Sequence, residues 1–189
     1  MQASNLNNYI YSIFYLQIKY SFKKWLLLFF FLQINFLLFA QFNSATIHIN
    51  GLTCSACSFA VQRSISTIDF VERIEMDLNE NIAMIVFKKN KAIDPSKLIQ
   101  GVKNAGFTVG KLELNYSTQN TSLSTRDCFT EGGTRYLIVD DTDTTFQGDV
   151  TFKLIHKSIV PKKEYKKYNK QVHQLSYETC KPNFLLSLR

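Results

Sequence analysis

Hydrophobic and polar residues alternate along four short stretches between residues 45 and 114. In the first stretch, Ile47 and Ile49 fall on one face of a predicted strand and His48 falls on the other. Alternation with a period of two is typical of strands that bury one face. The pattern predicts strands near residues 45–50, 74–78, 83–87 and 109–114, the middle two joined as a hairpin through Asn79-Glu80-Asn81.

Two helices are predicted between these strands. Apolar residues recur at i, i+4 and i+7 from Val61 to Ile68, which indicates a helix over about residues 55–67. A second helix is predicted to begin at Asp94-Pro95-Ser96 and to end at Gly106. The resulting order, βαββαβ, predicts an α+β fold: a ferredoxin-like sandwich of one four-stranded antiparallel sheet with both helices on one face.

The pattern changes after residue 114. Residues 115–125 are polar and of low complexity, which predicts a linker. Residues 126–189 then predict a small β-rich C-terminal unit, with strands at 136–139 and 150–154 and one helix at 162–172. This helix carries tyrosines on one face and lysines elsewhere. The lysines predict a solvated face or, alternatively, a surface that docks on a membrane or an acidic partner.

The first 40 residues predict an export signal. Lys23 and Lys24 precede the 16-residue apolar run Trp25–Ala40, and no acidic residue occurs before Asp69. A basic start, an apolar run and a small residue at its end are typical of a cleaved signal peptide. The run is shorter than the ~20 residues of a usual transmembrane helix. We therefore expect cleavage after Ala40, with a retained membrane anchor as the alternative and a buried helix as a third, and an oxidising compartment for the rest of the chain.

Composition and charge exclude several classes of protein. The 189 residues are 46% hydrophobic, enough for a folded core, and the formal net charge is +7. Three lysines and no acid lie in residues 1–40, so the charge of the remainder is modest and does not predict a nucleic-acid partner. The sequence contains no nucleophile with a nearby base motif, Gly-rich phosphate loop or metal-hydrolase signature, so we do not expect an enzyme.

The motif that carries chemistry is Gly51-Leu52-Thr53-Cys54-Ser55-Ala56-Cys57, between the first predicted strand and helix. Together with the element order and Ala105-Gly106-Phe107, it makes residues 45–114 similar to the heavy-metal-associated domain of copper chaperones, copper-pumping ATPases and the periplasmic mercury-binding protein. The family motif is G-M-T-C-x-x-C. Here Leu52 replaces the usual Met, a packing position in the family, and Phe70 stands where a turn glycine is common.

The resemblance implies that Cys54 and Cys57 hold the metal and pass it on by thiolate exchange. Thiolates select soft ions such as Cu(I) or Hg(II), and no His or third Cys lies nearby in sequence to complete a four-ligand zinc site. The resemblance also places Phe107 in the loop facing the site, where it either shields the metal or is an ordinary core aromatic.

We therefore expect an exported protein of the periplasm or cell envelope that binds Cu(I). Its partner would be a metal-exchanging envelope protein or a copper-transporting ATPase, and it would touch a membrane only through an uncleaved leader. The alternatives are capture of Hg(II), a dithiol-disulfide oxidoreductase, a structural disulfide between Cys54 and Cys57, or an adaptor whose C-terminal unit does the work. Unmetallated, the two thiols would be open to oxidation.

Cys128 and Cys180 bracket the predicted C-terminal unit. In an exported protein, a disulfide between them is the simplest interpretation. A second metal site with His156 or His173, or two free buried thiols, are the alternatives.

Overall fold

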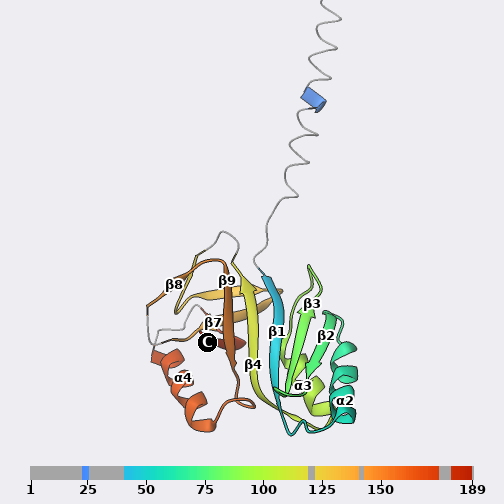
Figure 1. Ribbon diagram of the computed structural model, residues 1–189. Helices are drawn as coiled ribbons and strands as arrows, with labels where there is room; N and C mark the ends of the chain where they lie inside the picture. Colours follow the sequence, from blue (N-terminus) through green and yellow to red (C-terminus); the bar gives the residue numbers. More distant parts are fainter. Residues whose placement is uncertain (1–22, 26–40, 119–121, 141–142, 175–179, 189) are drawn as a thin grey trace, which may run out of the picture. The chain divides into compact units, whose positions relative to one another are not determined.

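The computed structural model describes residues 23–25, 41–118, 122–140, 143–174 and 180–188 (Figure 1). Of the predicted leader, it describes only Lys23 to Trp25, as helix. The apolar run and its cleavage site lie outside the described residues, so the signal peptide stays a prediction. Within the described ranges, no helix combines the length and apolar character needed to cross a membrane.

The first six elements form the predicted sandwich. The sheet order β2-β3-β1-β4 is antiparallel throughout, and side chains of both helices share a core with Ile47 and Ile49. The ferredoxin-like prediction is confirmed. The elements are β1 (Gln41–Asn50), α2 (Ser55–Ser66), β2 (Val71–Asp77), β3 (Ile82–Phe87), α3 (Pro95–Asn104) and β4 (Thr108–Ser117).

Local sequence signals set the ends of α3. The Asp94 carboxylate accepts a hydrogen bond from the Ser96 backbone N–H at 2.9 Å and so caps the first turn. At the other end, Gly106 has φ +90°, a conformation that glycine adopts without steric cost. Its N–H donates to Lys103 O, and the N–H of Phe107 donates to Val102 O at 3.1 Å. This pair of bonds is the Schellman motif, which turns the chain into β4.

The C-terminal elements extend the same sheet. They are β5 (Leu123–Ser124), β6 (Cys128–Glu131), β7 (Thr134–Ile138), β8 (Thr145–Phe146), β9 (Asp149–Ile155), α4 (Lys162–Gln174) and β10 (Phe184–Leu188). The full sheet order is β2-β3-β1-β4-β9-β10-β7-β6, with a separate β5-β8 pair. In Figure 1, β9 lies directly beside β4.

The linker expected at residues 115–125 is therefore partly strand. Residues 115–117 continue β4 and pair with β9, from Glu113 opposite Lys153 to Ser117 opposite Asp149. The physical reason is that the outer edge of β4 carries backbone N–H and C=O groups that need partners, and β9 supplies them. The sequence pattern of β4 shows its buried face but not which strand pairs with its edge.

One hydrophobic core extends across both parts of this sheet. Phe42 at the start of β1 packs against Tyr116 and Tyr136, with ring centroids 4.9 Å and 5.0 Å apart. Phe129 of β6 lies 5.1 Å from the Tyr116 ring. The Tyr136 hydroxyl also donates to the carbonyl oxygen of Ile93, just before α3, at 3.3 Å. The β6–β7 hairpin therefore covers the end of the β1–β4 face.

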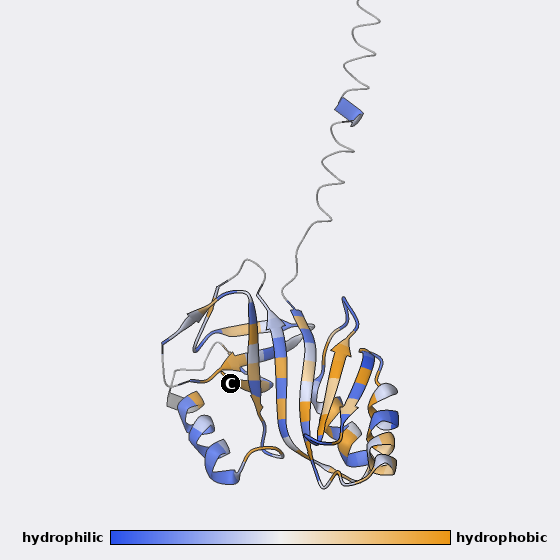
Figure 2. Cartoon of the chain, viewed as in Figure 1, coloured by the Kyte–Doolittle hydropathy of each residue, from blue (hydrophilic) through white to orange (hydrophobic). Residues whose placement is uncertain are grey.

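A second, smaller core lies under α4. Tyr165, Tyr168 and Val172, which the sequence places on one face of the helix, pack on a cluster of five residues: Leu137, Val139, Ile155, Val160 and Leu185. The rest of α4 is hydrophilic along most of its length (Figure 2). The predicted disulfide between Cys128 and Cys180 is present, with Cα atoms 6.3 Å apart, and joins β6 to the residues preceding β10.

Candidate metal site

A sharp turn after β1 places the motif at the start of α2. Gly51 has φ +81° and nothing within 4 Å of a Cβ added there, so its requirement for glycine is conformational. Leu52 is buried, 4% exposed, in the main core. It thus occupies the packing position that the family resemblance implied, while the residues after it remain at the surface.

Cys54 is the N-cap of α2. Its backbone is extended (φ −148°, ψ 159°), and its sulfur accepts a hydrogen bond from the Cys57 N–H at 3.3 Å. The free N–H groups of a helix start carry partial positive charge, which favours a thiolate over a neutral thiol. Cys57 lies in the first turn, close to the same end. The helix therefore supplies electrostatic stabilisation to both sulfurs in their reduced form.

Ser58 fixes the first turn from the inside. Its backbone N–H donates to Cys54 O at 3.1 Å, and its hydroxyl lies 3.3 Å from both Cys54 O and Ser55 O. Ser58 is only 5% exposed, so these bonds satisfy a buried hydroxyl. This polar contact holds the backbone of Cys54 while leaving its side chain unobstructed.

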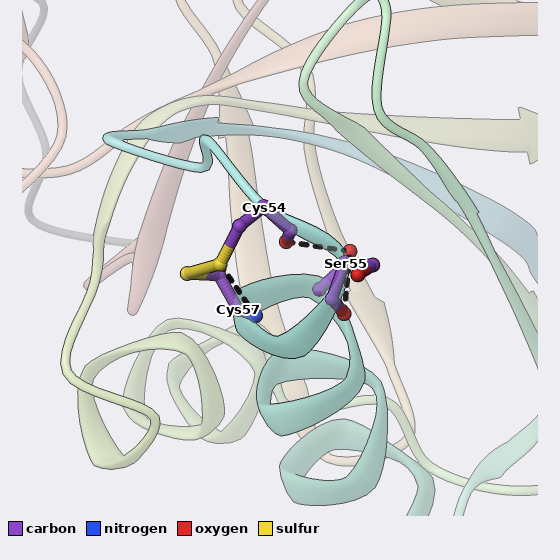
Figure 3. Close-up of a disulfide and its surroundings, with 4 residues drawn as sticks. Cys54, Ser55 and Cys57 are labelled. Atoms are coloured by element: carbon purple, nitrogen blue, oxygen red, sulfur yellow. Dashed lines mark hydrogen bonds between the residues drawn. A yellow bond between two sulfur atoms is a disulfide. The ribbon is translucent and has the colours of Figure 1, made fainter.

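The two sulfurs are joined as a disulfide (Figure 3). The Cα atoms of Cys54 and Cys57 are 5.2 Å apart; Cys54 is exposed, whereas Cys57 is half-buried and packs against the main core. A disulfide offers no thiolate, so this is the form that does not ligate a soft ion. Reduction by two electrons converts the pair to thiols, which bind metal on losing their protons.

The surroundings provide few additional ligands. Among the described residues, no group of three or more His, Cys, Asp or Glu side chains is arranged to hold a metal. Phe107 is half-buried and packs against the main core. The arrangement can therefore supply two sulfur ligands at an open surface.

One surface residue beside the motif was not predicted from the sequence. Phe59 of α2 is 64% exposed, within two turns of Cys54. Its signal was available, because an aromatic residue outside the buried stripe of Val61 and Ile65 must face away from the core. Together with the exposed Ala56 and Ala60, it gives the start of α2 an apolar outer side.

Comparisons with known proteins converge on the same segment. Residues 46–108 match the heavy-metal-associated domain family. A copper-transporting ATPase of Helicobacter felis is 38% identical over 48 residues, which is 25% of this chain and 7% of the ATPase. The mercuric transport protein periplasmic component of Pseudomonas fluorescens is 29% identical over 68 residues, 36% of this chain and 74% of that protein. The crystal structure of oxidised MerP from Ralstonia metallidurans has 26% identity and a TM-score of 0.34, covering 36% of this chain and 94% of MerP.

The sandwich and the family match together assign this segment to a class of metal-binding domains. Residues 46–108 are a heavy-metal-associated domain, and the similarity covers this segment of the chain only. The chain spans a small fraction of the copper-transporting ATPases that it matches.

Proposed function

We propose that this protein binds Cu(I) between the thiolates of Cys54 and Cys57 and exchanges it with a partner protein. The observation that carries the proposal is the placement of both sulfurs at the start of α2, within bonding distance of each other and at the surface. Two soft sulfur ligands suit a monovalent soft ion, and the positive end of the helix favours their charged form.

Exchange is supported by the difference in exposure between the two cysteines, since Cys54 is exposed and Cys57 is half-buried. Cys54 is exposed, so a thiolate of another protein would reach a metal bound there and form a three-coordinate bridge before the metal leaves. The apolar side chain of Phe59 would lie in the contact with that protein. The partner would be a metal-exchanging envelope protein or a copper-transporting ATPase.

The direct test is a Cu(I) competition titration of the reduced protein. We expect Cys54→Ser and Cys57→Ser each to lower the Cu(I) affinity by orders of magnitude without unfolding the chain, because neither side chain is fully buried. The matched control is the double variant Cys128→Ser/Cys180→Ser, which removes two sulfurs elsewhere and should keep the affinity. Wild-type affinity in either site variant would refute the assignment of the ligands.

Two specific observations favour alternatives. The similarity to mercuric transport proteins supports capture of Hg(II) by the same pair, and the ratio of Cu(I) to Hg(II) affinities under one competitor distinguishes the metals. The Cys54–Cys57 disulfide supports a dithiol-disulfide oxidoreductase. Such an enzyme would reduce insulin disulfides catalytically, whereas a metal carrier would not.

Export follows as part of the same proposal. The predicted signal sequence in residues 1–40 would deliver the fold to the periplasm or cell envelope, and the Cys128–Cys180 disulfide suits an oxidising compartment. There the Cys54–Cys57 pair would need a reducing partner, or metal supplied before oxidation, in order to act.

A further inference from the structure

We propose that α4 presents a basic surface that docks on an anionic phospholipid bilayer. The surface, called here the α4 lysine face, goes beyond metal binding and involves none of the motif residues. All its members are exposed: Lys162, Lys163, Lys166, Lys167 and Lys170. Five cations thus lie on one helix of 13 residues, which is about 20 Å long.

The fold holds this face outward. Tyr165, Tyr168 and Val172 pack into the smaller core and fix the rotation of the helix about its axis. The lysines therefore point to solvent, because the opposite side of the helix packs on the smaller core. Docking therefore requires no ordering of the helix backbone, which keeps the conformational part of the entropic cost of binding small.

The described part of the fold leaves most of the charge of this face without an ion-pair partner. The one acidic residue of the helix, Glu164, pairs with Lys153 of β9 at 2.8 Å and is directed toward the sheet. Lys162, Lys163, Lys166 and Lys170 take part in none of the ion pairs found among the described residues. A net positive surface remains, which attracts a partner of opposite charge.

The residue types favour a bilayer over a specific anionic site. The face contains lysine and no arginine, and lysine acts as a point charge, whereas the forked arginine side chain suits defined phosphate or carboxylate geometry. Each lysine near an anionic bilayer contributes about 1 kcal/mol without any fixed geometry.

The experiment is lysine footprinting of the full chain on vesicles. The protein is incubated with phosphatidylcholine vesicles, or with vesicles of an equal mixture of phosphatidylcholine and phosphatidylglycerol, then acetylated and mapped by mass spectrometry. We expect the α4 lysines to be protected on the mixed vesicles only. Exposed lysines on the loop after β3, Lys88, Lys89 and Lys91, should stay reactive and serve as internal controls. Lys23 and Lys24 of the leader are mapped as separate sites, so protection of the α4 lysines is read apart from any binding through the leader.

A variant pair makes the test quantitative. Lys163→Gln/Lys166→Gln/Lys170→Gln should lower the anionic-lipid-dependent part of vesicle binding on the order of 100-fold. The matched control, Lys88→Gln/Lys89→Gln/Lys91→Gln, removes the same charge and should change it little. Equal losses in both variants, or protection independent of the anionic lipid, would overturn the proposal. So would protection of the α4 lysines by soluble polyglutamate but not by the mixed vesicles, which would assign the face to an acidic protein.

Discussion

At the scale of single residues, the carboxyl group of Glu131 has a strongly raised pKa. Glu131 ends β6, half-buried beside the aromatic cluster, and burial raises the pKa of its carboxyl to about 7. Burial, with the nearby Glu131 charge as a smaller cause, also raises the pKa of Tyr116 to about 12 and raises that of Tyr136. The protonated carboxyl is therefore the form that this part of the core prefers.

This shift predicts that stability falls as the pH rises. Between pH 4.5 and 7, the folded chain holds a proton on Glu131 that the unfolded chain has lost, so the free energy of unfolding decreases across this window. Glu131→Gln, which resembles the protonated form, should therefore stabilise the protein by about 1 kcal/mol at pH 8 and hardly at pH 4.5, allowing for screening of a half-buried group. Urea unfolding at the two pH values measures this. The exposed Glu80→Gln should leave the pH dependence unchanged, and equal behaviour of the two variants would contradict the prediction.

At the scale of elements, the turn of the β6–β7 hairpin contacts the loop before α3. Gly132 (φ +55°) faces this loop so closely that a Cβ there would lie 2.6 Å from the Cβ of Ala92. Gly133 (φ +81°) has nothing within 4 Å of such an atom. Both glycines therefore adopt a left-handed backbone conformation, but only at Gly132 is there no room for a Cβ atom.

Comparing alanine variants of the two glycines separates the energy of the hairpin–loop contact from the cost of backbone strain. Gly133→Ala should cost about 1 kcal/mol, the penalty for the left-handed conformation. Gly132→Ala should cost a further 1–3 kcal/mol, because the hairpin must move away from Ala92. Denaturant unfolding of both variants gives the difference. Equal losses would mean that the hairpin moves freely and that its contact with the loop contributes little.

The elements also show what the sequence could and could not predict. Strands β1 to β4 and helix α3 were predictable because alternation, a capping Asp94 and a stop at Gly106 are local signals. Strand β10 was missed because it is buried on both faces, so the run FLLSL shows no alternation. The start of β1 at Gln41 was hidden by a register shift between Phe42 and Ser44 that interrupts the pattern.

The candidate site also has one feature that the sequence predicts directly and one that it gives only as an alternative. The proximity of Cys54 and Cys57 follows from their spacing at a helix start, so the sequence was sufficient to propose the pair. Their joining as a disulfide was foreseen only as an alternative, because the bond depends on redox conditions and not on spacing.

At the scale of the whole molecule, the metal-binding domain does not have a separate core. Phe42 and Tyr116 lie on β1 and β4, yet in the described part of the chain their aromatic neighbours include Phe129, Tyr136 and Phe152 of the C-terminal strands. Strand β9 also pairs with β4 along its outer edge. The two parts should therefore fold as one cooperative unit, in contrast to two domains joined by a linker.

A chain that ends at Ser117 tests this. Truncation would expose Phe42 and Tyr116, now 2% and 5% exposed, and remove the partner of the β4 edge. Loss of burial for the two rings alone is on the order of 4 kcal/mol, a large part of the stability of a small domain.

We expect the full chain to unfold in a single transition, with circular dichroism and tyrosine fluorescence coincident. The truncated chain should be strongly destabilised and should associate through its open edge. Two separate transitions in the full chain, or a truncated chain as stable as the intact one, would show that residues 41–117 fold independently. In that case the C-terminal strands would serve another purpose than completing the core around the metal-binding domain.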